Sequence, residues 1–266
     1  CHSGVRFYIE VLVEKSLLDV DRNDCLCMHD LIQCMGKEIV RQEDPSNPGE
    51  RSRIWDYKDI LTVLHEDSGS NKIEGIIFDP PQQKQLVEWS GESFKKMDNL
   101  RILVVRRAQF SIEPKYLPNN LRWLEWDGYP CTTLPSDFSS GKLVSLTLWN
   151  SLFNLVEPLE RFEHLTSMDF SFSESITEMP NMSQCQSLRR LRLEGCSNLI
   201  KIHDSVGFLS NLVDLYVGKC AKLAWFPHEI NLPSLKIIDI SGCKSLHYFP
   251  HIVRKMDSLT GIFAEE

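Results

Sequence analysis

The chain has 266 residues, of which 42% are hydrophobic and 25% are charged, and these values are typical of a folded globular protein. Its net charge of -8 argues against a nucleic-acid surface, because neutralising phosphates requires an excess of basic side chains. The nine cysteines lack the paired spacing of a disulfide framework, so we expect a reducing compartment: the cytoplasm, with nuclear localisation as the alternative.

No apolar run approaches the roughly 20 residues that span a bilayer, and the first residues lack the basic and apolar zones of a signal peptide. We therefore expect no membrane partner. One sequon, Asn181-Met182-Ser183, gives weak support to the alternative of an extracellular repeat receptor. Because the chain starts at Cys1 within ordinary domain sequence, we expect it to be a fragment of a longer protein.

Residues 11–42 predict a helix end, two short strands and a second helix. The strands are predicted at Leu17–Val20 and Cys25–Met28, with a polar turn at 21–24. A helix follows, because apolar residues recur at a spacing near 3.6 and Asp30 stands in the N-cap position. A hairpin followed by a helix is typical of the end of a winged-helix domain.

The stretch CLCMHDLIQCMG, residues 25–36, resembles a metal-ligand cluster at first sight. Cys25 and Cys27 are two apart on a predicted strand, which separates them by about 6.6–6.8 Å of backbone rise. Two sulfurs that share a tetrahedral zinc ion at ~2.3 Å would lie only about 3.7 Å apart. Cys34 would have to return from the helix, and no fourth ligand is near, so we predict no metal site.

Residues 45–53, PSNPGERSR, contain two prolines and a glycine and must end the second helix. A short helix around Asp59 to Leu64 and a Ser/Gly stretch at 67–70 follow. The predicted domains are therefore residues 1–70, which close a winged-helix module and include a linker, and residues 71–266.

A repeat governs the second domain. The pattern LxxLxL recurs at steps of 21 to 24 residues, which is the period of a leucine-rich repeat. A single unit cannot offset the conformational entropy of its own residues, whereas stacked units bury a continuous leucine ladder. The predicted fold class is α/β, a curved parallel-sheet solenoid of about eight repeats. The repeats begin at Leu100, Leu121, Leu143, Leu165, Leu188, Leu212, Leu235 and Leu259.

Three cysteines, Cys196, Cys220 and Cys243, occupy the slot that takes Asn or Cys in the template LxxLxLxxCxxL. We expect them to turn inward beneath the bend after each strand and to be structural.

Strand alternation assigns the two faces of the sheet. With Leu191 and Leu193 inward, Arg190, Arg192 and Glu194 face the concave surface. Trp, Tyr and Arg are enriched where proteins bind one another, so a protein ligand is predicted there; a merely solvated surface is the alternative. The predicted ligand-binding residues are Trp123, Glu125, Trp149, Asp169, Arg190, Arg192, Asp214, Tyr216 and Asp239.

Two blocks of the chain carry a resemblance to a known family. They are MHDLIQCMGKEIVRQE, residues 28–43, and PGERSRIW, residues 48–55, followed by IEGI at 73–76. They resemble plant intracellular nucleotide-binding leucine-rich-repeat disease resistance proteins of the TIR class. In that family the Met-His-Asp motif closes the nucleotide-binding NB-ARC module, and its histidine faces the diphosphate of ADP in the resting state.

The resemblance assigns nucleotide sensing to Met28, His29 and Asp30. A histidine at a helix start can donate a ring N–H to phosphate oxygens, while Asp30 would cap the helix and Met28 would pack inward. This chain contains no GxxxxGK[ST] loop, so ADP or ATP is expected only in the full-length protein, and no cofactor is expected for this chain alone.

The resemblance implies a defence function in which the repeats recognise a partner and hold an ADP/ATP switch closed. The expected partners are a pathogen effector or a guarded host protein on the concave face, and the protein's own upstream NB-ARC domain. Oligomer formation on activation of the full-length protein is also implied. Two alternatives remain: a general protein-interaction scaffold without a switch, and part of a TIR NAD hydrolase whose catalytic domain lies elsewhere. No catalytic motif occurs in this sequence, so we predict that it is not an enzyme.

Overall fold

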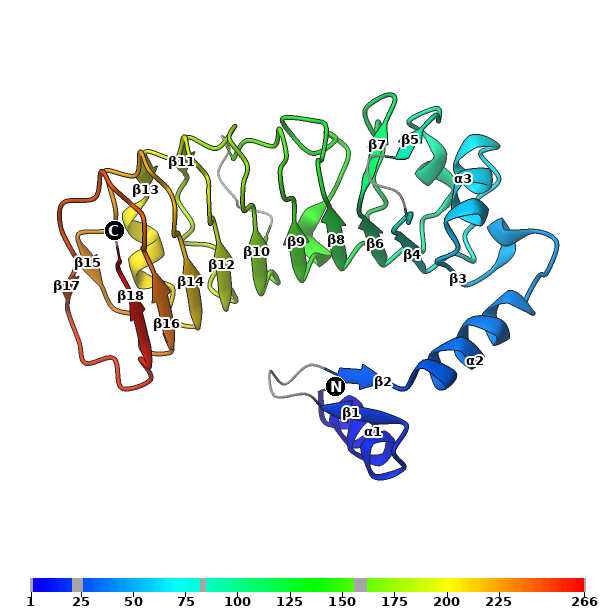
Figure 1. The fold of residues 1–266 in the computed structure, drawn as a ribbon, viewed down its shortest axis with the longest axis horizontal. Helices are drawn as coiled ribbons and strands as arrows, with labels where there is room; N and C mark the ends of the chain where they lie inside the picture. The colour runs from blue at the N-terminus through cyan, green and yellow to red at the C-terminus, as the bar shows by residue number, and fades with distance from the viewer. Residues whose placement is uncertain (1, 21–25, 82–84, 156–161, 266) are drawn as a thin grey trace.

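The computed structural model describes residues 2–20, 26–81, 85–155 and 162–265 (Figure 1). The predicted turn at 21–24 and Cys25 lie outside the described residues.

The N-terminal part contains two helices and one hairpin, as predicted. Helix α1 (His2–Glu14) is followed by strands β1 (Leu18–Val20) and β2 (Leu26–Met28), which pair antiparallel. Helix α2 (Asp30–Arg41) follows directly. In Figure 1 this part, drawn in blue, lies apart from the solenoid, and α2 leads from it to the start of the repeats.

The segment between α2 and the repeats contains regular secondary structure. A 3₁₀ turn, η1 (Pro48–Glu50), leads to β3 (Arg53–Ile54) and to α3 (Tyr57–His65). The Asp56 side chain caps α3 by accepting hydrogen bonds from the N–H groups of Lys58 and Asp59.

One parallel sheet of ten strands runs the length of the solenoid (Figure 1). Its strands are β3, β4 (Gly75–Phe78), β6 (Ile102–Val105), β8 (Trp123–Trp126), β9 (Ser145–Thr147), β10 (Ser167–Asp169), β12 (Arg190–Arg192), β14 (Asp214–Tyr216), β16 (Ile237–Asp239) and β18 (Gly261–Phe263). The last eight fall on the eight predicted LxxLxL units, which confirms the predicted solenoid. The sheet itself starts earlier, at β3 and β4, where no LxxLxL pattern occurs.

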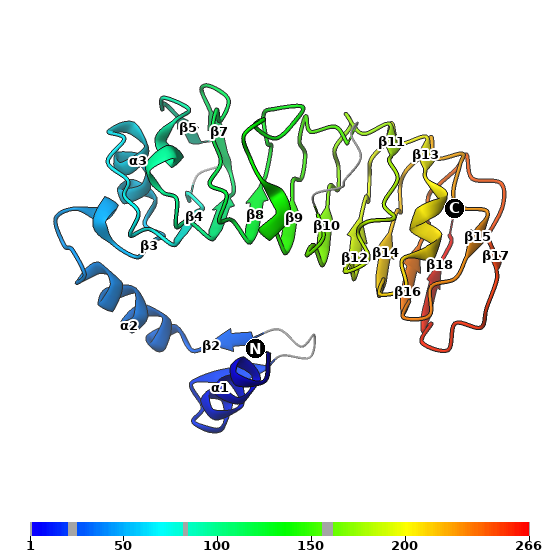
Figure 2. The ribbon, with the colours of Figure 1, turned by 180° about the vertical axis from the view of Figure 1, so that it is seen from behind.

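Shorter elements form the return side of each repeat (Figure 2). Three pairs of short parallel strands lie there: β5 (Gln85–Val87) with β7 (Ala108–Phe110), β11 (Glu178–Met179) with β13 (Lys201–Ile202), and β15 (Glu229–Ile230) with β17 (His251–Ile252). The 3₁₀ turns η2 (Ser93–Lys96), η3 (Ser140–Lys142) and η4 (Asp204–Phe208) complete the connections.

The core is a ladder of aliphatic side chains from consecutive strands. Leu146, Met168, Leu191, Leu215 and Ile238 are neighbours in register, and each is at most 1% exposed. Burying each of them is worth roughly 1.5–3 kcal/mol.

A row of aromatic rings fills the first half of this core. Successive ring centroids lie 4.8–6.5 Å apart, mostly in edge-to-face geometry, which is the favourable arrangement for ring pairs. The row comprises Phe78, Trp89, Phe94, Phe110, Trp126, Tyr129, Phe153 and Phe170.

The first seven LxxLxL repeats each bend at a residue with left-handed backbone conformation, which allows the chain to leave the strand at the same position of the repeat. The φ angles of these residues lie between 47° and 70°: Arg107, Gly128, Asn150, Phe172, Gly195, Lys219 and Gly242. Glycine is favoured at 195, because its φ is positive and an added Cβ would lie 2.5 Å from Cδ1 of Phe172.

The three template cysteines are buried and structural, as predicted. The thiols of Cys196, Cys220 and Cys243 each donate to a main-chain carbonyl of the preceding repeat at 3.1–3.2 Å. Ser173 continues this ladder with a hydrogen bond to the carbonyl of Leu148. Burial raises the pKa of Cys196 to about 11, so that thiol stays protonated and unreactive at neutral pH.

Among the described residues, no helix combines the length and the apolar composition needed to cross a bilayer.

Candidate functional site

The Met-His-Asp motif lies at the junction of β2 and α2, where all three side chains are exposed. The expectation that Met28 packs inward is wrong, since 45% of this residue is accessible. The expectation that Asp30 caps the helix is also wrong. The N-cap residue is His29, whose backbone is non-helical and whose Nδ1 accepts a hydrogen bond from the N–H of Leu31 at 3.2 Å.

The capping bond decides what the imidazole of His29 can do. A nitrogen that accepts a hydrogen bond carries no proton, so in the neutral ring the proton lies on Nε2. Nε2–H is then available as a donor at a helix N-terminus, where the partial positive charge of α2 favours an anion. Asp30 lies in the first turn of α2, and its negative charge interacts favourably with the same helix terminus.

Helix α2 carries an apolar face without a partner among the described residues. Leu31, Met35 and Ile39 follow one another at i, i+4 and i+8, and they are 69%, 63% and 67% exposed. Burying three such side chains would be worth several kcal/mol, since each contributes ~1.5–3 kcal/mol. A contiguous exposed apolar face is typical of an interaction site.

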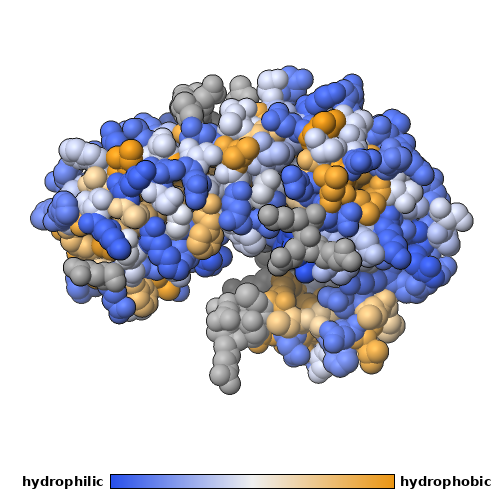
Figure 3. Space-filling model, turned by 45° about the horizontal axis from the view of Figure 1, so that its top comes forward, coloured by the Kyte–Doolittle hydropathy of each residue, from blue (hydrophilic) through white to orange (hydrophobic). Residues whose placement is uncertain are grey.

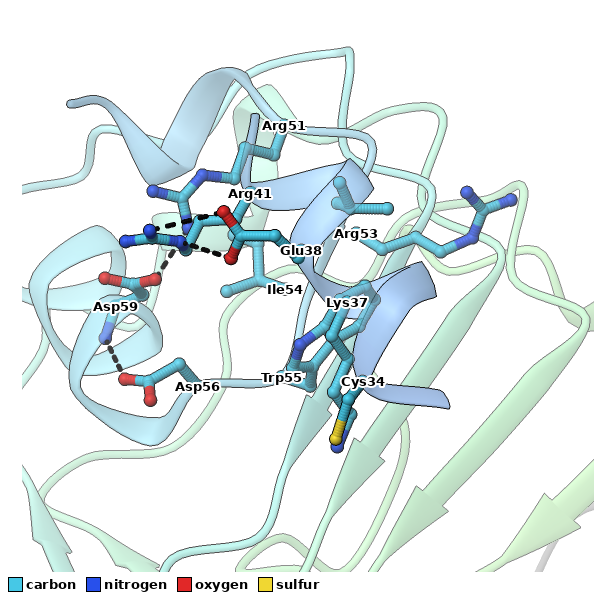
Figure 4. Close-up of a pocket in the computed structure, with 11 residues that line it drawn as sticks. Cys34, Lys37, Glu38, Arg41, Arg51, Arg53, Ile54, Trp55, Asp56 and Asp59 are labelled. Atoms are coloured by element: carbon cyan, nitrogen blue, oxygen red, sulfur yellow. Dashed lines mark hydrogen bonds and ion pairs between the residues drawn. The ribbon is translucent and has the colours of Figure 1, made fainter. Parts of the chain in front are cut away.

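The opposite face of α2 lines a charged pocket of about 350 Å³ against the first turn of the solenoid (Figure 4). Arg41 forms an ion pair with Glu38 at 2.9 Å, and this contact lowers the pKa of Glu38. Arg51 lies deeper and pairs with Asp59 at 2.7 Å. The pocket is lined by Cys34, Lys37, Glu38, Val40, Arg41, Arg51, Arg53, Ile54, Trp55, Asp56 and Asp59.

The outward side of the parallel sheet, which we call the sheet face, holds the predicted ligand-binding residues. Strand register arranges the outward side chains in two rows. One row runs Ile102, Trp123, Ser145, Ser167, Arg190, Asp214 and Ile237. The other runs Val104, Glu125, Thr147, Asp169, Arg192, Tyr216, Asp239 and Phe263. Their inward neighbours form the core ladder, which confirms the predicted assignment of faces.

Accessibility differs along the sheet face. Trp123 is 45% exposed, and Trp149, just beyond the end of β9, is half-buried. Glu125 and Asp169 are only 5% and 8% exposed. Arg106 donates to Glu125 at 2.5 Å, and this bond raises the pKa of Arg106, so Glu125 is already engaged within the chain.

In the C-terminal half of the sheet face, charged and aromatic residues contact one another. Arg190 pairs with Asp214 at 3.1 Å, and the guanidinium of Arg192 lies 4.6 Å from the ring centroid of Tyr216. Asp239 accepts the N–H of Ser241. Arg192 thus presents a planar cation held on an aromatic ring, which is an ordered contact surface.

Sequence reasoning missed two exposed isoleucines on the same face, Ile77 and Ile102, at 42% and 44% accessibility. Ile77 lies on β4, before the first LxxLxL unit, and Ile102 lies within the first unit, where strand alternation alone could have shown it.

On another face of the molecule, hydrophobic residues form small groups among hydrophilic ones (Figure 3).

Within the part of the chain that the structure describes, no three His, Cys, Asp or Glu side chains are grouped as metal ligands. Cys27 and Cys34 are exposed there, and Cys25 lies outside it.

Comparison with known proteins finds similar sequences along most of the chain. Residues 1–44 match the winged-helix domain of Roq1-like disease resistance proteins. The chain is 34% identical over 257 residues, 96% of its length, to TMV resistance protein N of Nicotiana glutinosa, and covers 22% of that protein. It is 36% identical over 256 residues to disease resistance protein RPS6 of Arabidopsis thaliana, covering 92% of this chain and 22% of RPS6.

The homologues of this chain are plant disease resistance proteins. The recognition drawn from the Met-His-Asp and PGERSRIW blocks is therefore confirmed. The chain spans about a fifth of the length of these relatives.

The solved structures support the fold. The leucine-rich repeat domain of the type III effector XopL superposes with a TM-score of 0.53 at 19% identity, covering 82% of this chain and 76% of that domain. At this identity the likeness concerns the fold alone.

Proposed function

We propose that this disease resistance segment recognises a protein through its sheet face and reports that contact to a nucleotide switch that includes His29. The observation that carries the proposal is the register of the sheet, which places Trp123, Arg190, Arg192 and Tyr216 on one continuous face. Large aromatic and arginine side chains dominate binding energy at protein interfaces. The partner would be a pathogen effector or a guarded host protein.

Support for the switch comes from the geometry of His29. Its Nε2–H is available to a diphosphate, and α2 adds its helix dipole at the same point. One charge-assisted hydrogen bond supplies only ~1.5–3 kcal/mol, whereas micromolar affinity needs about 8 kcal/mol. This chain would therefore bind ADP measurably only together with an upstream phosphate-binding module.

The exposed face of α2 fits the same proposal. Leu31, Met35 and Ile39 would pack on an upstream part of the nucleotide-binding module. The segment would thus have two interfaces: α2 toward the switch and the sheet face toward the ligand.

The recognition role is tested in the full-length receptor with Trp123→Ala combined with Tyr216→Ala. We expect loss of the defence response to the matching effector at unchanged protein abundance. The control is Trp225→Ala, which removes a tryptophan that is 56% exposed on the return side. If Trp225→Ala abolished the response and the double variant did not, the sheet face would not be the recognition surface.

The switch role is tested by His29→Ala and Asp30→Val in the same receptor. His29→Ala removes both the cap and the phosphate donor, so we expect ligand-independent signalling. Asp30→Val removes a favourable charge at the helix start, worth about 0.3–1 kcal/mol, and should give weaker signalling of the same kind. A receptor that stays silent in both variants would support the scaffold alternative.

A further inference from the structure

The segment between α2 and the repeats is bonded to its surroundings at many points and does not have the properties of a flexible linker. Directly after α2, the carboxylate of Glu43 accepts the N–H of Ser52 at 2.6 Å and its hydroxyl at 2.8 Å. Asp44 accepts the N–H groups of Ser46 and Asn47. The turn that follows α2 is thus tied to the strand that opens the sheet.

Arg51 lies at the centre of this segment and is only 5% exposed. Its guanidinium donates to the carbonyls of Asp44 and Pro45 at 2.7 and 3.1 Å and to the carboxylate of Asp59 at 2.7 Å. A single buried side chain therefore joins the turn after α2 to helix α3. Its fork of donors suits this geometry, which the single ammonium group of a lysine could not reproduce.

Further contacts bind the same segment to the first turn of the solenoid. Gly49 packs so closely that an added Cβ would lie 2.0 Å from the carbonyl oxygen of Ser68. The hydroxyl of Ser70 donates to the carbonyl of Gly49 at 2.7 Å, and Lys72 pairs with Glu50 at 3.0 Å. Strand β3 then joins the parallel sheet beside β4.

We propose that residues 43–72 form a rigid coupling, which we call the clasp, and that Arg51 is its positioning residue. The clasp fixes the direction of α2 relative to the sheet, so the solenoid and α2 turn as one body. Val40, in the last turn of α2, is buried and lines the same pocket as Arg51 and Ile54. Helix α2 has 12 residues, so a rotation of the solenoid is carried to His29 through a lever about 18 Å long.

The clasp can be tested in this chain without nucleotide or partner, and the test is therefore separate from that of the proposed function. Spin labels are attached at Gln33→Cys on α2 and Gln109→Cys on β7, both exposed positions, after Cys1, Cys25, Cys27 and Cys34 are changed to serine. Pulsed electron–electron double resonance then measures the distribution of distances between the two labels. We expect one narrow distribution for the chain with an intact clasp.

Arg51→Ala should broaden the distribution, and Asp59→Asn, which leaves the two carbonyl bonds of Arg51, should broaden it less. Arg53→Ala is the matched control, because Arg53 is exposed and forms no ion pair within the described ranges; its side chain donates only a long hydrogen bond, 3.3 Å, to the hydroxyl of Ser52 there. Hydrogen exchange checks the fold: the amide of Ser52 should lose protection by at least about tenfold in Arg51→Ala, while the strands from β8 onward stay protected.

The proposal is overturned by a broad distribution in the unmodified clasp or by equal widths for Arg51→Ala and Arg53→Ala. If Arg51→Ala also unfolds the strands from β8 onward, the comparison rests on Asp59→Asn, whose width must then exceed that of Arg53→Ala.

Discussion

Replacing Gly195 by alanine tests whether the left-handed bend of each repeat is a steric requirement or a mere preference. Gly195 and Gly128 occupy the same place in their repeats, with φ of 69° and 70°. An alanine at 128 meets nothing within 4 Å, whereas an alanine at 195 would place Cβ 2.5 Å from the ring of Phe172. The two sites thus share the backbone strain and differ in the clash.

The magnitudes follow from these two terms. Left-handed backbone destabilises an alanine by about 1–2 kcal/mol. The alanine also lowers the conformational entropy of the unfolded chain, which offsets ~0.4–1 kcal/mol of this strain. Gly128→Ala should therefore cost about 1 kcal/mol. The Phe172 ring is 50% exposed and must leave its preferred rotamer, which adds about 0.5–1.5 kcal/mol, so Gly195→Ala should cost about 1.5–2.5 kcal/mol in total.

Urea unfolding followed by circular dichroism measures both variants, and a double-mutant cycle isolates the clash. In a Phe172→Ala background, Gly195→Ala should cost no more than Gly128→Ala does in the original chain. Equal costs for the two single alanine variants, or an unchanged cost of Gly195→Ala without the phenylalanine ring, would refute the steric reasoning.

Two further predictions concern the core. Leu191→Asp should lower the thermal midpoint strongly because it buries an unpaired charge, whereas Tyr216→Ala on the sheet face should shift the free energy of unfolding by no more than about 1 kcal/mol; similar melting curves would place the strand one residue out of register. Stability should also fall above pH 9, because unfolded thiols ionise there while burial keeps the pKa of Cys196 and Cys220 raised in the fold. With a folded pKa of about 11 against 9.0 unfolded, Cys196 lowers the free energy of unfolding by ~1 kcal/mol at pH 10. In the double variant Cys196→Ala with Cys220→Ala, the free energy of unfolding from urea titrations should fall less between pH 8 and pH 10. An equal fall in the double variant and the original chain would contradict this prediction.

The repeats were predictable because their signal is periodic and their core positions are aliphatic. Leu191 and Cys196 follow a template in which spacing alone determines the face and the hydrogen-bond partner. Strand β4, with the sequence GIIF, was missed because its core contact is made by Ile76 and Phe78 instead of leucines. Ser173 was missed as a ladder residue, because serine replaces the cysteine of the template while keeping the hydrogen bond.

The motif at the start of α2 could be located but not oriented from the sequence. Asp30 and His29 are adjacent, and both can cap a helix, so the choice depends on which residue first adopts helical backbone angles. The clasp was read as a linker because its Pro and Gly residues signal a break in the helix. The partners that order it, such as Asp59 for Arg51, are eight residues away and belong to another element.

The tryptophans are distributed unevenly, so intrinsic fluorescence reports on the first half of the chain more than on the second half. Of the six tryptophans, Trp55, Trp89, Trp123, Trp126 and Trp149 precede residue 150, and Trp225 alone follows it. Intrinsic fluorescence therefore reports mainly on the first turns, while the far-ultraviolet signal of the sheet averages over all of them. If the last repeats unfold before the aromatic row does, the fluorescence and far-ultraviolet signals will have different midpoint temperatures. The difference between these midpoints will measure how far cooperative unfolding extends along the chain.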